Sequence, residues 1–159
     1  MVTEPGRSTY VSSLDVRVVR DAQSVVASMH QLAVREAVSQ LTAEDCARMR
    51  TAHRRFAAAL RRGDVDAALE ADDHLHDIPV AAAANQAIKT VLEQFTPVLR
   101  RVERLRFSSL SGRSSVALHD TLIDLCETGD AAAATVSWET WQTLEPLLDP
   151  AVGTDAPDG

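Results

Sequence analysis

Apolar residues recur every three or four positions along most of the chain, the spacing that gathers them on one face of a helix. The first stripe runs from Val18 through Val25 and Leu32 to Ala37. Most residues favour helices, and only two short stretches look strand-like. The pattern predicts helices at approximately residues 15–37, 42–62, 65–79, 82–106, 114–128 and 131–148.

Turn residues mark the ends of these helices. Gly63 and Gly129 are each followed by aspartate; glycine suits the turn after one helix, and aspartate caps the next. Thr42 with Asp45 three residues later resembles a capping box. Pro79 is expected to kink or break the third helix. We therefore predict an all-α fold, an antiparallel bundle of about six helices with short loops.

The composition is that of an ordinary soluble domain. The 159 residues are 45% hydrophobic and carry a net charge of −7, so this chain alone is not expected to bind nucleic acid. No apolar run approaches the roughly 18 residues of a membrane span, and the N-terminus has no signal-peptide pattern. We expect no membrane partner and a cytoplasmic location. Cys46 and Cys126 are expected to be reduced thiols.

The two ends of the chain differ from its middle. Residues 1–14 hold a turn signal and a short β-prone stretch, and residues 149–159 offer little to bury. We expect residues 15–148 to form the helical domain and residues 149–159 a disordered acidic tail.

Polar residues on apolar stripes are the candidates for chemistry. Asp72 and His76 lie four residues apart on the face that carries Val65 and Leu69, so both should point inward. His119 lies on the apolar stripe of the fifth predicted helix. A buried carboxylate is costly unless paired or bound to a metal, and imidazole with carboxylate suits zinc, nickel or manganese. The set is a candidate metal site, and the same spacing also fits an Asp–His pair beside a core histidine.

Other polar and aromatic residues have simpler interpretations. His53 reads as a core or interface histidine, and Trp138 and Trp141 as core residues of the last helix. Asp73 and Asp77 fall on other faces of their helix, so we expect them to be solvated.

Four features occur in order: Asp72 four residues before His76, Asn85 nine residues after that histidine, the later His119, and the Gly-Asp-x-x-x-Ala motif at 129–134. This order resembles the ligand-binding (FCD) domain of GntR-family transcription regulators of the FadR subfamily, with leucine replacing the usual phenylalanine before the first histidine. The resemblance covers the whole predicted helical domain.

The resemblance implies a divalent transition metal, zinc or nickel, held by one aspartate and three histidines. Matched by position, the ligands here are Asp72, His76 and His119. The fourth histidine is expected at position 141, where this chain has Trp141. Tryptophan offers only an N–H donor and cannot bind a metal.

The resemblance also implies a homodimer that binds a small carboxylate effector beside the metal. Asn85 and Trp141 would line the effector pocket, and His30 would compensate for an Arg/Glu pair that the family often carries on its first helix. Residues 1–14 resemble the end of a winged-helix domain, so DNA would be bound only through a domain missing from this chain.

Two alternatives to this sensor module remain open. One is a metal-free helical dimerisation module in which Trp141 fills the former site. The other, disfavoured by helical phase, is a metal-dependent hydrolase with Asp73 or Asp77 as general base. We expect no enzymatic activity.

Overall fold

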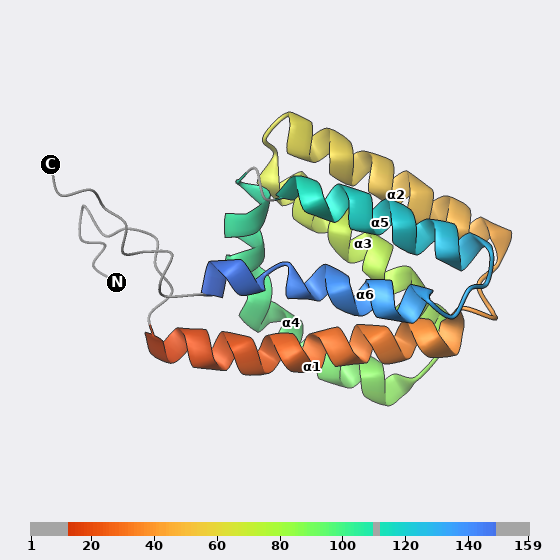
Figure 1. The fold of residues 1–159 in the computed structure, drawn as a ribbon, viewed down its shortest axis with the longest axis horizontal. Coiled ribbons are helices and arrows are strands. Elements are labelled where there is room, and N and C mark those ends of the chain that lie inside the picture. The colour runs from red at the N-terminus through yellow and green to blue at the C-terminus, as the bar shows by residue number, and fades with distance from the viewer. Residues whose placement is uncertain (1–12, 110–111, 149–159) are drawn as a thin grey trace, which may run out of the picture.

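The computed structural model describes residues 13–109 and 112–148 (Figure 1), and the expectations for the two chain ends largely fall outside these ranges. The described residues form six α-helices and no strand, which confirms the predicted all-α bundle. The elements are α1 (Ser13–Ala37), α2 (Ala43–Arg61), α3 (Val65–Ala83), α4 (Gln86–Phe107), α5 (Arg113–Glu127), α6 (Ala133–Gln142) and the short 3-10 helix η2 (Glu145–Leu148).

The predicted turn chemistry is present at the start of α2 and α3. The Thr42 side chain accepts the Asp45 N–H and the Asp45 carboxylate accepts the Thr42 N–H, both at 3.0 Å, so the capping box is complete. Asp64 caps α3 by accepting a first-turn N–H at 3.0 Å. Gly63 and Gly129 have positive φ angles of 71° and 67°, which glycine tolerates without strain.

The predicted helix break at Pro79 is wrong. α3 continues through this buried proline for another turn, because proline removes a single helical hydrogen bond and the packing of its neighbours on the core retains the helix. The chain turns instead at Ala84, whose φ is 52°. α4 consequently begins at Gln86 and not near Ala82, and Asn85 caps it by accepting two N–H groups of the first turn.

The last predicted helix is divided in two. α6 ends at Gln142, and a turn separates it from η2. Trp138 was predicted to lie in the core, but 38% of it is exposed, because it falls on the outer side of α6. Trp141, three residues later, is 5% exposed.

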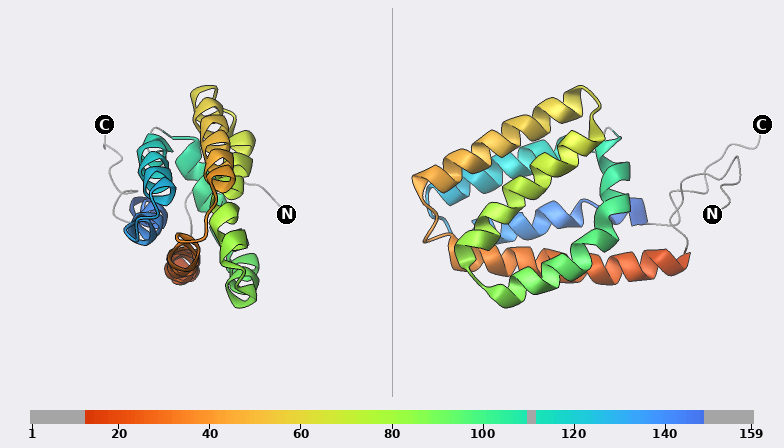
Figure 2. Two further views of the ribbon diagram at one scale, coloured as in Figure 1. Left: turned by 90° about the vertical axis from the view of Figure 1, so that its right-hand side faces the viewer. Right: turned by 180° about the vertical axis from the view of Figure 1, so that it is seen from behind.

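The helices enclose one interior. α1 lies alongside α6 and contacts α3 and α4, whereas α2 packs on α3 and α5 (Figures 1 and 2). α5 also packs on α6, and α3 contacts α1, α2 and α4. No helix among the described residues combines the length and apolarity needed to cross a bilayer.

Candidate metal centre

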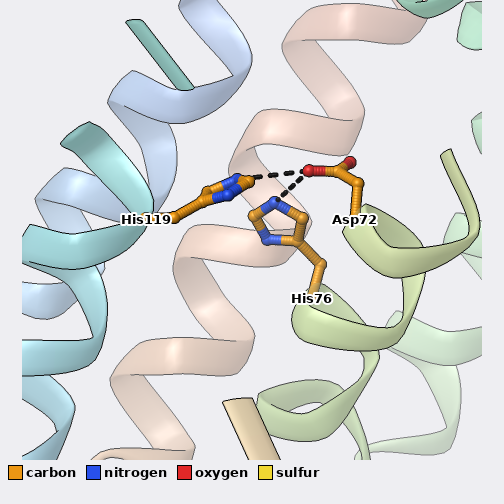
Figure 3. A group of neighbouring side chains, drawn as sticks. All are labelled: Asp72, His76 and His119. Atoms are coloured by element: carbon orange, nitrogen blue, oxygen red, sulfur yellow. Dashed lines mark ion pairs between the residues drawn. The ribbon is translucent and has the colours of Figure 1, made fainter. Parts of the chain in front are cut away.

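Three predicted metal ligands meet in the centre of this bundle. Asp72 and His76 project one turn apart from α3, and His119 projects toward them from α5 (Figure 3). One oxygen of Asp72, Oδ1, lies 3.4 Å from His76 Nε2 and 3.1 Å from His119 Nε2. The three residues are at most 5% exposed. The helical spacing predicted their inward direction, and the fold brings them together.

The geometry of the three donor atoms suits a metal ion. Tetrahedral zinc with ligands at roughly 2.0–2.1 Å separates pairs of ligand atoms by about 3.3 Å, which lies between the two measured separations. Neither histidine Nε2 makes an aligned hydrogen bond to a described residue, although both approach the carboxylate. Buried nitrogen atoms without hydrogen-bond partners are costly, and coordination would satisfy them. These three residues therefore fit a divalent transition metal.

The electrostatics of the cluster keep Asp72 ionised. Burial alone raises the pKa of Asp72, but the facing His76 and His119 outweigh burial and hold it well below its usual range. Burial also lowers the pKa of His76, yet Asp72 reverses this and the pKa is raised. The pKa of His119 is lowered by burial despite the same carboxylate. The pKa values of the two imidazoles are therefore shifted in opposite directions.

An aromatic layer from α1 and α6 covers one side of the cluster. The rings of His30 and Trp141 stack with centroids 4.7 Å apart and planes 15° apart. Each ring also lies against His76, at 5.4 and 5.3 Å. Burial and the neighbouring His76 lower the pKa of His30 to about 3, so this imidazole is neutral at physiological pH. The sequence predicted both residues beside the site, and the structure places them there.

A small cavity adjoins Asp72 and His76. Its volume is about 20 Å³, and the water-sized space that a single molecule needs is roughly 10–15 Å³. Besides the two ligands, its walls are formed by α4, α5, α6 and the following turn: Glu103, Arg106, Phe107, Ser115, Thr140, Trp141, Thr143 and Leu144. The site therefore has room for one further small ligand group.

Comparison with protein families gives one match. The model of the FCD domain matches residues 21–140. The chain belongs to the FCD domain family. Such domains are the regulatory, effector-binding parts of GntR-type regulators, and metal binding is common among them. Neither the curated proteins nor the solved structures gave a match.

Two buried charges in this FCD domain were not singled out from the sequence. Arg106 is 2% exposed, and its guanidinium donates to the hydroxyls of Ser115 and Ser114 at 3.0 and 2.8 Å and to the Thr143 carbonyl. No carboxylate among the described residues forms an ion pair with it. Burial lowers the pKa of Arg106 to about 10. Arg106, the last arginine of the basic stretch 100–106, thus contributes one cation to the interior.

Glu103 is the second missed charge. It is 2% exposed, and one of its oxygens accepts from Arg100 at 3.1 Å while Oε1 has no partner in the described structure. Burial, reinforced by Asp72, raises the pKa of Glu103 to about 8. Its position on the inner stripe of α4, one residue after Val102, was the available signal.

Asn85, Asp73 and Asp77 lie outside the small cavity of this FCD domain. Asn85 caps α4 and its amide donates to Glu36 at 3.4 Å. Asp73 pairs with Arg100 at 2.9 Å, and Asp77 is exposed. All except Glu36 line an outer groove of about 930 Å³ between α3 and α4. Of the two residues considered as the base of a hydrolase, Asp77 is exposed. Asp73 is held by Arg100, although one of its oxygens lies within 4.8 Å of an oxygen of Asp72.

Proposed function

We propose that this FCD domain is the effector-binding and dimerisation domain of a FadR-type transcription regulator, sensing a small organic acid beside a divalent metal. Asp72, His76 and His119 would hold the metal. The observation that carries the proposal is the convergence of three buried donors whose histidine nitrogens lack hydrogen-bond partners. When bound, the metal supplies a Lewis acid for a carboxylate oxygen.

The residues around the metal connect it to several helices. Asp72 and His76 belong to α3 and His119 to α5, whereas Arg106 and Trp141 bring α4 and α6 to the same cavity. A ligand that enters the cavity contacts elements that are far apart in sequence. It can therefore favour one relative position of these helices over another, which is how ligand binding shifts a two-state regulator. In a regulator of this type, such a shift would be passed through the dimer to a DNA-binding winged-helix domain.

One observation favours a second candidate, a metal-free dimerisation module. Asp72 already has a charge partner, because its carboxylate raises the pKa of His76 and is itself stabilised as an anion. An Asp–His ion pair can thus satisfy the buried carboxylate without a metal. The two candidates differ in whether the fold is stabilised by added metal.

Metal loading separates these candidates. The purified protein is stripped with chelator, incubated with zinc or nickel, and assayed by inductively coupled plasma mass spectrometry and thermal melting. We expect one ion per chain and a melting temperature that rises with metal, because an ion that binds only the folded state stabilises it. His76→Gln should lose both effects. His74→Gln is the matched control, since His74 is an exposed histidine of the same helix.

Two results would contradict the metal-bound sensor, one by its lack of metal and one by its lack of an organic-acid effector. Absence of bound zinc and nickel, with equal melting temperatures before and after metal addition, would favour the metal-free module. If metal binds, acetate and other small carboxylates are titrated calorimetrically into the loaded protein. Failure of all of them to bind would contradict the organic-acid effector while leaving the metal site intact.

A further inference from the structure

The small cavity beside Asp72 carries polar groups that the protein does not satisfy. Trp141 lines it, is 5% exposed, and has an indole Nε1–H without a hydrogen-bond partner among the described residues. Glu103 lines the same cavity and its Oε1 is likewise unpartnered. A buried donor that bonds nothing is costly, so its retention points to a ligand atom that it meets.

The charges around the cavity favour an anion. Arg106 is a buried cation held by neutral hydroxyl and carbonyl groups. A divalent ion and Arg106 together carry three positive charges, and Asp72 supplies one negative charge. Even when Glu103 is ionised, at least one positive charge is left over. Uncompensated charge in a low-dielectric interior is unfavourable, and a monoanion would neutralise it.

The volume restricts which anion can enter. The cavity of about 20 Å³ is closed on one side by Trp141, which stacks on His30 with the rings nearly parallel. Because this space admits about one water-sized group, the smallest carboxylates, formate and acetate, require the least movement of the cavity walls. A second carboxylate would have to displace the indole, at the expense of its packing in the core.

We propose that Trp141 determines the specificity of the effector site: its Nε1–H binds an oxygen of the anion and its ring limits the ligand to short monocarboxylates such as formate and acetate. The residue at the position of the expected fourth histidine then acts as a hydrogen-bond donor to the ligand, and the fourth coordination position is left open. This inference rests on the proposed metal site and adds the class of effector.

The test uses the protein loaded with Co²⁺, whose visible absorption reports on its coordination. Formate, acetate, succinate and citrate are titrated into the wild type, Trp141→Phe and Trp138→Phe. Trp141→Phe keeps an aromatic ring but removes the donor, whereas Trp138 is the partly exposed tryptophan of the same helix and serves as control. Metal affinity and melting temperature are measured for each protein.

We expect the wild type to bind formate and acetate and to show no spectral response to succinate or citrate. Trp141→Phe should bind formate about 10-fold more weakly, the effect of losing a hydrogen bond to a charged group, with unchanged Co²⁺ affinity. Trp138→Phe should match the wild type.

Each contrary result has a distinct meaning. Equal formate affinity in the wild type and Trp141→Phe, or tight citrate binding by the wild type, overturns the role of Trp141 while the metal site stands. Failure of the wild type to bind Co²⁺ overturns the metal-bound sensor itself, and this inference with it.

Discussion

Asp72 and Asp73 are consecutive residues of α3, yet their carboxylates have opposite surroundings. Asp72 points into the bundle and meets two histidines at 3.1 and 3.4 Å, in a place almost closed to solvent. Asp73 points to the outer groove, where a guanidinium of Arg100 holds it at 2.9 Å and its side chain is 40% exposed.

The two sites differ in whether their polar groups have hydrogen-bond partners, and not in the kinds of residue that they contain. At the outer site, Arg100 donates two hydrogen bonds to one Asp73 oxygen and one to the other, so the pair is complete. At the inner site the Nε2 atoms of His76 and His119 and the nearby Glu103 Oε1 have no hydrogen-bond partner in the described part of the chain. Buried polar groups without hydrogen-bond partners point to a ligand that would bind them. A surface ion pair with all its hydrogen bonds formed does not.

The largest effect on metal affinity is expected from a comparison in which Asp72 and Asp73 are each replaced by asparagine in separate variants. Asp72→Asn removes a charged ligand, and we expect metal affinity to fall by roughly 100-fold or more, beyond the loss typical of residues that only support ligands. Asp73→Asn should stay within about threefold of the wild type, because its charge is exposed and paired. Competition with a chromophoric chelator measures both affinities.

Melting of the metal-free variants provides the control for this comparison. Asp72→Asn also loses its interaction with His76, so a decrease in apo stability is expected and must be separated from lost metal binding. Equal metal affinity of the two variants would show that the inner cluster is not a metal site.

Much of the fold and part of the site were predictable because the periodicity of apolar residues along a helix indicates which way each side chain faces. The spacing placed Asp72, His76 and His119 on inward faces, and capping residues located the start of α2. Periodicity does not report the balance between one lost hydrogen bond and side-chain packing, so the continuation of α3 through Pro79 was missed. Nor does it distinguish a buried arginine from a solvated one within a basic run, as for Arg106.

The role of Asn85 shows another limit. The family resemblance implied an effector contact for Asn85. In the structure its amide oxygen caps α4, a role that depends on where α3 ends. Because the boundary between α3 and α4 was predicted several residues too early, this local role was not visible. An effector contact by Asn85 stays a prediction, although Asn85 lies outside the small cavity beside Asp72.

An intermediate effect is expected from acid, through His30 of the inner region. The pKa of His30 is lowered by burial to about 3, below its value of 6.5 in an unfolded chain. The unfolded state then binds a proton that the folded state excludes, so this residue lowers stability as pH falls below 6.5 and toward 3. Between pH 7.5 and 5.0 its contribution is about 2 kcal/mol.

Urea unfolding of metal-free wild type and His30→Gln at the two pH values checks this contribution. The wild type should lose about 2 kcal/mol more stability on acidification than the variant does. Using metal-free protein excludes competition between protons and metal for the ligands. Identical losses would mean that His30 does not remain neutral in the folded state.

The smallest effect is expected at the outer pair. A double-mutant cycle with Asp73→Asn, Arg100→Gln and the combined variant isolates the energy of their interaction. Although its hydrogen bonds are complete, the pair is partly exposed, with 40% and 32% of the two side chains accessible, so solvent and salt screen the attraction. We expect a coupling below about 1 kcal/mol by urea unfolding, decreasing further at high salt.

A coupling of several kcal/mol would mean that the second contact of Arg100, with buried Glu103, strengthens the pair and joins the two regions into one network. A small coupling would mean that, of the two regions, the inner cluster is the one in which a change of charge on α3 has a large effect.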